Sequence, residues 1–94
     1  GFCHTGAHDL GQHTVCVQVT ADFLNFSQQV GNDLITPVPQ FGFAGLKPGD
    51  YWCVCVTRWK QALDAGYAAP IKLASCHEAA LNYVSLAELR QHAI

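Results

Sequence analysis

The sequence contains few charged residues, no methionine and no long apolar run. Charged side chains make up 13% of the 94 residues, and the formal net charge is -2. The basic residues are spread along the chain, which disfavours a nucleic-acid-binding surface. Apolar runs are broken by Gly, Pro or charge well short of the roughly 20 residues that cross a bilayer, so we expect no membrane span. Because the chain begins at Gly1 and contains no methionine, we also expect that a natural N-terminal segment has been removed.

A regular cysteine framework is also lacking. The chain has five cysteines, at positions 3, 16, 53, 55 and 76. An odd number without regular spacing is atypical of a secreted domain held together by disulfides. Cys53 and Cys55 stand two apart on an apparent strand, a separation poorly suited to a mutual disulfide. We therefore expect reduced thiols, no native disulfide and a cytoplasmic location.

Nucleotide-binding loops are absent as well. Gly42, Gly45 and Gly49 lie in a proline-rich stretch that leads into a strand, whereas a P-loop or dinucleotide fingerprint opens a helix. Half of the residues are hydrophobic, which is typical of a compact protein. The length predicts one domain that spans residues 1–94.

The first half of the chain predicts a strand, a helix and a long loop. Residues 13–19 alternate in the manner of a strand, with valines on one face. Thr20 is a suitable N-cap for a helix over residues 21–30. Residues 32–48 contain too much Pro and Gly for a long regular element, so we expect a loop that ends in a type II turn.

The second half repeats the alternation of strand and helix. Residues 51–56 are apolar on both faces, which indicates a central strand, and Thr57 is placed to cap the next helix. Residues 71–74 predict a third strand. Capping boxes at Ser75-x-x-Glu78 and Ser85-x-x-Glu88 predict two further helices. The expected fold class is α+β, with a small sheet of about three strands and three to four helices packed against it.

Apolar periodicity also predicts one hydrophobic core. Its expected members are Val15, Val17, Phe23, Phe26, Val54, Val56, Trp59, Leu63, Leu81 and Leu89.

Short motifs along nearly the whole chain are similar to those of a bacterial family, the domain of unknown function 2237. They are Cys3-x-Thr5-Gly6, Gly11-x-His13-Thr14-Val15-Cys16, Phe23-Leu24-x-Phe26-Ser27, Gly31-Asn32-Asp33-Leu34-x-Thr36-Pro37, Gly42-Phe43-x-Gly45-Leu46-Lys47-Pro48-Gly49-Asp50, Trp52-Cys53-x-Cys55, Arg58-Trp59 and His77-Glu78. The resemblance implies a bacterial protein but no particular activity, cofactor or substrate. Compared with that family, this chain has Cys76 where a Thr commonly precedes the His. We also expect that an N-terminal segment with a further cysteine, which members usually carry, is missing from it.

The cysteines and histidines suggest two kinds of chemistry. Thiolate and imidazole are the ligands that zinc prefers, and the candidates are Cys3, Cys16, Cys53 and Cys55, with His4 and His13. No C-x-x-C pair is present, so the spacing favours buried structural cysteines over a zinc site. Alternatively, a cysteine could act as a nucleophile with His13 or His77 as its base. Cys76 follows the expected helix cap at Ser75, where a helix N-terminus would lower its thiol pKa.

Polar residues at the ends of the expected elements suggest a third kind of site. His13, Asp33, Asp50 and Arg58 could meet near the long loop, with Trp52 as a wall of the pocket. They could equally be turn caps and an internal ion pair between Arg58 and an aspartate. The sequence thus favours a small binding or interaction domain, with a homodimer as one form of interaction. The alternatives are a small enzyme that uses His with Cys or Asp, and a Cys/His metal-binding domain.

Overall fold

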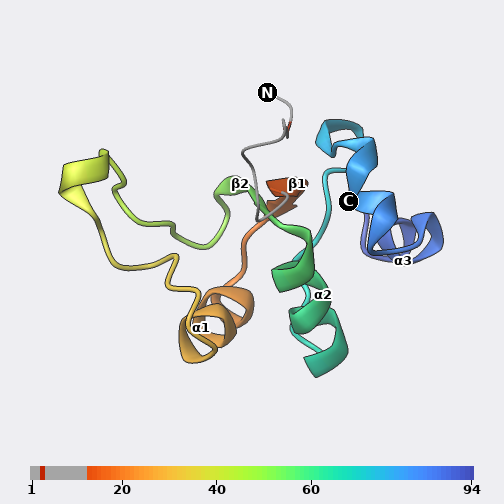
Figure 1. The fold of residues 1–94 in the computed structure, drawn as a ribbon. Coiled ribbons are helices and arrows are strands. Elements are labelled where there is room, and N and C mark those ends of the chain that lie inside the picture. The colour runs from red at the N-terminus through yellow and green to blue at the C-terminus, as the bar shows by residue number, and fades with distance from the viewer. Residues whose placement is uncertain (1–2, 4–12) are drawn as a thin grey trace.

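The computed structural model describes Cys3 and residues 13–94, which form a two-stranded antiparallel sheet with helices around it (Figure 1). The strands are β1 (His13–Gln18) and β2 (Tyr51–Cys55), and the α-helices of this part of the chain are α1 (Ala21–Gln29), α2 (Val56–Ala65) and α3 (Leu86–Gln91). Short 3-10 helices occupy Pro39–Phe41, Leu73–Ser75 and Glu78–Asn82. The α+β class is confirmed.

The inner strand is β1, and the prediction that residues 51–56 form the central strand is wrong. One edge of β1 pairs with β2, and the segment of residues 70–77 follows the other edge. In that segment, the backbone N–H of Lys72 donates to the carbonyl of Cys16 at 2.9 Å, and that of His77 donates to the carbonyl of Thr14 at 2.8 Å. The backbone of β1 is therefore held from both sides.

The expected third strand over residues 71–74 is reduced to isolated bridges. Ile71 pairs with Val17 and with Ala93, and the chain then turns into the 3-10 helix Leu73–Ser75. Because residues 73–75 form this 3-10 helix, they cannot continue the strand pairing that begins at Ile71. The predicted capping box at Ser75 does not form either, because Cys76 and His77 have extended backbone and His77 becomes the N-cap of Glu78–Asn82.

Helix ends follow the local sequence signals in most places. Thr20 accepts a hydrogen bond from the N–H of Phe23 at 3.1 Å and caps α1, as predicted. Ser85 forms the predicted capping box of α3 with Glu88. The cap expected at Thr57 is wrong, because α2 begins two residues earlier than that cap implies, with Cys55 as its N-cap and no side-chain cap.

Buried side chains from the sheet and helices form one hydrophobic cluster. Trp59 and Phe23 are its largest fully buried members. Most of the predicted core is confirmed, although Phe26 and Leu63 are only partly buried. Leu81 was expected in the core but is 48% exposed. It lies in a 3-10 helix, whose three-residue repeat buries Ala80 and turns Leu81 outward.

The long loop extends to one side of the sheet in Figure 1 and returns through the predicted turn into β2. In that turn, the N–H of Asp50 donates to the carbonyl of Lys47 at 3.0 Å, and Gly49 has a φ of 98°, which a glycine adopts without steric cost. Among the described residues, no helix is both long and apolar enough to cross a membrane.

Candidate functional site: a cluster of three cysteines

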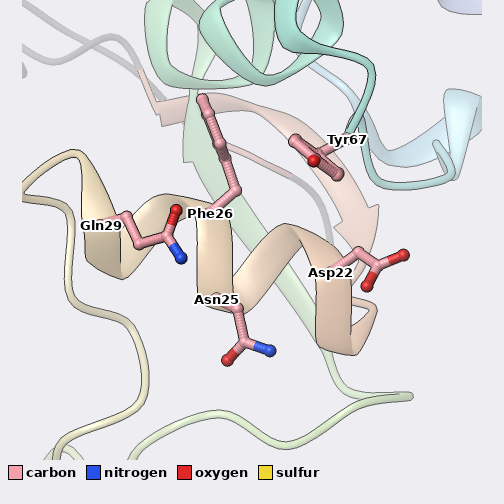
Figure 2. A pocket seen from close by; sticks show the side chains of 5 residues that line it. All are labelled: Asp22, Asn25, Phe26, Gln29 and Tyr67. Atoms are coloured by element: carbon pink, nitrogen blue, oxygen red, sulfur yellow. The ribbon is translucent and has the colours of Figure 1, made fainter.

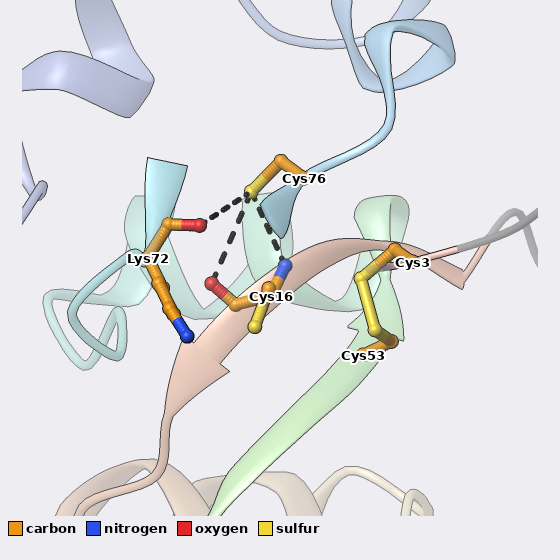
Figure 3. Close-up of a disulfide and its surroundings, with 5 residues drawn as sticks. All are labelled: Cys3, Cys16, Cys53, Lys72 and Cys76. Carbon is orange, nitrogen blue, oxygen red and sulfur yellow. Dashed lines mark hydrogen bonds between the residues drawn. A yellow bond between two sulfur atoms is a disulfide. The ribbon is translucent and has the colours of Figure 1, made fainter. Parts of the chain in front are cut away.

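Three cysteines gather at the middle of the sheet. The sulfur atoms of Cys3, Cys16 and Cys53 all lie within 4.8 Å of one another. Cys3 and Cys53 are joined by a disulfide across a sequence separation of 50 residues, with their Cα atoms 5.6 Å apart (Figure 3). The prediction that no disulfide forms is wrong, because an odd number of cysteines leaves at least one thiol free but does not prevent the others from pairing.

The two strands place Cys16 beside the disulfide. Cys16 lies directly opposite Cys53 in the register of β1 and β2. Its N–H donates to the sulfur of Cys76 at 3.2 Å and its carbonyl accepts from Lys72, so both backbone groups point away from β2. Cys16 and Cys53 are therefore a non-hydrogen-bonded cross-strand pair, the kind that brings side chains closest together.

Cys3 reaches the sheet from far away in the sequence. Its backbone N–H donates to the carbonyl of Ser75 at 2.9 Å. Ser75 belongs to the segment of residues 70–77, which follows the edge of β1 that faces away from β2. Cys3 is 4% exposed and Cys16 is 6% exposed, whereas Cys53 is half-buried. Of the three residues, Cys53 is thus the one that solvent reaches most easily.

Burial controls the thiol acidity around the cluster. It raises the pKa of Cys16, and the positive charge of Lys72 offsets part of this effect. Burial also raises the pKa of Cys76, so the lowered pKa that we expected at a helix N-terminus is not found there. Figure 3 shows the Cys76 sulfur in contact with the backbone of Cys16 and with the carbonyl of Lys72. Both Cys16 and Cys76 are therefore protonated thiols at neutral pH.

The remaining metal or nucleophile candidates lie in other surroundings. The sulfur of Cys55 is 3.0 Å from the hydroxyl oxygen of Thr57 and is not part of the cluster. The Nδ1 atom of His77 accepts a hydrogen bond from the N–H of Ala79 at 3.0 Å and so serves as a helix cap. His4 lies outside the described residues. His13 is exposed at the start of β1, opposite Cys55.

The two aspartates of the predicted polar pocket organise their own turns. Asp33 accepts hydrogen bonds from the N–H groups of Ile35 and Thr36, at 2.9 and 3.0 Å. A hydrogen bond from the Thr36 side chain, followed by these backbone bonds, lowers the pKa of Asp33 to about 2. Asp50 accepts from the N–H of Lys47 at 2.9 Å. Both carboxylates are exposed.

Arg58 connects two helices. From α2 it donates to the carbonyl of Val30, at the end of α1, at 3.1 Å, and to Gln61 at 3.3 Å. Within residues 13–94, Arg58 forms no ion pair with either predicted aspartate. Trp52 is 41% exposed and packs its ring on Phe43, with centroids 5.6 Å apart. The pocket that the sequence predicts from these residues stays a prediction.

A shallow hollow of 180 Å³ lies on a different part of the surface (Figure 2). Phe26 of α1 and Tyr67, which follows α2, form its apolar walls, with ring centroids 5.4 Å apart. Asp22, Asn25 and Gln29 complete the lining. None of the predicted ligand-binding residues takes part in it.

Taken together, the fold and the cluster define a small α+β protein with a disulfide beside a buried free thiol. The chain belongs to a bacterial family described as an uncharacterized protein conserved in bacteria (DUF2237), whose family model matches residues 1–93. This confirms the resemblance inferred from the motifs. A search of curated proteins found no match.

Proposed function

We propose that this chain is a thiol–disulfide redox protein. Its working group is the Cys3–Cys53 disulfide, with Cys16 as a third sulfur. The observation that supports this function most directly is the position of the free Cys16 thiol, which lies within 4.8 Å of both bonded sulfurs. A disulfide that serves only as a cross-link has no need of a third sulfur at this distance.

The difference in burial suggests how reduction proceeds. An external thiolate attacks the sulfur of Cys53, because that residue is half-buried while Cys3 and Cys16 are buried. The Cys3–Cys53 bond breaks, Cys3 leaves as a thiolate and takes up a proton, and Cys53 carries the mixed disulfide. A second external thiol then attacks the external sulfur, which leaves Cys53 as a thiol and releases an external disulfide. The protein gains two electrons and two protons.

Cys16 offers a second route from the mixed disulfide. Its thiolate can attack the sulfur of Cys53 and expel the external thiol, which forms a Cys16–Cys53 bond across the strands. Because burial raises the pKa of Cys16, this step is slow at neutral pH and becomes faster as pH rises through that pKa. Because Cys16 is a protonated thiol at neutral pH, it does not readily attack the neighbouring Cys3–Cys53 disulfide.

The proposed function agrees with a cytoplasmic location. Cys16, Cys55 and Cys76 are free thiols, which suits a reducing compartment. Disulfides in such compartments are usually transient and take part in catalysis or redox sensing. A reversible Cys3–Cys53 bond therefore fits the cytoplasm better than a permanent cross-link would.

A redox titration tests this function. We expect protein equilibrated with graded ratios of reduced and oxidised glutathione to pass through one reversible two-electron transition, from three free thiols to five. Circular dichroism should report a folded protein at both ends. Cys53→Ser should abolish the transition, whereas Cys55→Ser should leave it unchanged because Cys55 contacts Thr57 and not the cluster. A disulfide that is reduced only after the protein has been unfolded would contradict a redox function.

A further inference from the structure

We propose that the reduced cluster of Cys3, Cys16 and Cys53 is a binding site for a soft d¹⁰ metal ion such as Zn²⁺, with three thiolate ligands. This inference rests on the proposed reversibility of the disulfide, because the bonded sulfurs of Cys3 and Cys53 become thiolates only after reduction.

The geometry of the sulfurs suits one ion. Thiolates that each lie about 2.3 Å from a zinc ion are roughly 4 Å apart from one another. The three sulfurs of the cluster lie within 4.8 Å, so small side-chain rotations after reduction bring them to that spacing. Thiolate ligands select soft ions of this kind over Mg²⁺ or Ca²⁺, which prefer oxygen.

Three separate parts of the backbone hold the ligands before a metal binds. Cys16 is fixed by β1, and Cys53 by its opposite position on β2. Cys3 is fixed by the hydrogen bond from its N–H to Ser75. The strand pairing and this hydrogen bond thus pre-organise the three ligands in part.

The charge around the site is also favourable. Three thiolates and one Zn²⁺ carry a net charge of about −1, as each thiol gives up its proton. The positive charge of Lys72 acts on Cys16 and offsets this excess. On the half-buried side of Cys53, a water or small ligand can take a fourth coordination position.

Metal binding and the disulfide exclude each other. A disulfide oxidant such as oxidised glutathione takes two electrons from the Cys3 and Cys53 thiolates and leaves as two thiolates, which take up protons from water. The new Cys3–Cys53 bond removes two of the three ligands and releases the ion. Oxidation would therefore convert a metal-binding form into a metal-free form.

Cd²⁺ provides a direct probe, because its bonds to thiolates absorb in the ultraviolet by charge transfer. We expect fully reduced protein, titrated anaerobically against a competing chelator, to bind one equivalent of Cd²⁺ with this absorption. Protein that carries the Cys3–Cys53 disulfide should bind none at the same site. Reduced protein that binds no Cd²⁺ at one equivalent would overturn the inference.

Variants separate this site from the other cysteines and from the redox function. Cys16→Ser and Cys16→Ala should each weaken Cd²⁺ binding by roughly tenfold or more, while the Cys3–Cys53 redox transition remains. Cys55→Ser should bind Cd²⁺ as the unmodified protein does, because its sulfur is not in the cluster and contacts Thr57 instead. Unchanged affinity in both Cys16 variants would refute the three-thiolate site without affecting the proposed redox function.

Discussion

At the scale of single residues, the Trp59 side chain both fills the core and donates a hydrogen bond to a buried carbonyl. Its ring is fully buried, and its indole N–H donates to the carbonyl of Ala69 at 3.0 Å. Ala69 is fully buried as well, so the indole is the partner that compensates for the desolvation of this carbonyl. The sequence predicted the burial of Trp59 from its helical spacing, but it gave no indication of the distant partner.

We expect Trp59→Phe to lower the free energy of unfolding by about 1–3 kcal/mol, because a buried carbonyl loses its hydrogen-bond donor. Urea unfolding followed by circular dichroism measures this change. Trp52→Phe is the matched control, because Trp52 is 41% exposed and the new ring can still pack on Phe43. It should change stability by less than about 0.5 kcal/mol. Equal losses in the two variants would contradict the assigned role of Trp59.

At the scale of the elements, the sequence correctly predicted the helix ends that depend only on neighbouring residues, such as N-caps and glycine stops. Thr20 caps α1, and Gly66 ends α2 with a φ of 87°. The capping box at Ser75 has the same letters as the box at Ser85 but does not form. The segment of residues 70–77 instead gives its hydrogen bonds to the edge of β1, as at Lys72 and His77. A non-local contact thus overrides a local helix signal.

The box that does form gives a test at this scale. We expect Ser85→Ala to destabilise the protein by about 1 kcal/mol, because the N–H of Glu88 loses the acceptor that Ser85 provides at 3.0 Å. Ser85→Asp should retain most of the stability, because Asp is also a good N-cap. Urea unfolding of both variants measures the difference. Equal destabilisation by Ala and Asp would argue against capping as the cause.

The same box should contribute to the pH dependence of stability. The hydrogen bond from the backbone of Ser85, followed by that from Lys60, lowers the pKa of Glu88. A carboxylate with a lowered pKa in the folded state stabilises the protein above its unfolded pKa, and this contribution is lost as pH falls through the folded value. Glu88→Gln should therefore reduce the loss of unfolding free energy as pH falls through the pKa of Glu88, which urea unfolding at a series of acidic pH values measures.

At the scale of the whole molecule, the Cys3–Cys53 bond links the N-terminal end of the chain to β2. Part of the cluster could have been predicted, because an antiparallel pairing of the two cysteine-containing strands can place Cys16 opposite Cys53. The position of Cys3 could not, since it depends on a backbone contact with Ser75, distant in sequence.

The redox state also affects the stability of the whole chain. Closing a loop of 50 residues is worth about 2–4 kcal/mol through the entropy of the unfolded chain. Neither Cys3 nor Cys53 is a member of the hydrophobic cluster formed by the sheet and helices. The reduced protein should therefore be less stable but still folded, which a reversible redox function requires.

Site-resolved alkylation with mass spectrometry shows directly whether the Cys3–Cys53 disulfide is reversible in the folded protein. The protein is equilibrated with oxidised or with reduced glutathione, quenched in acid, and alkylated under denaturing conditions without reductant. We expect oxidised protein to contain linked peptides of Cys3 and Cys53, with Cys16, Cys55 and Cys76 alkylated. Reduced, folded protein should be alkylated at all five cysteines. Five alkylated cysteines under both conditions, or a bond that joins Cys55 or Cys76 instead, would contradict this expectation.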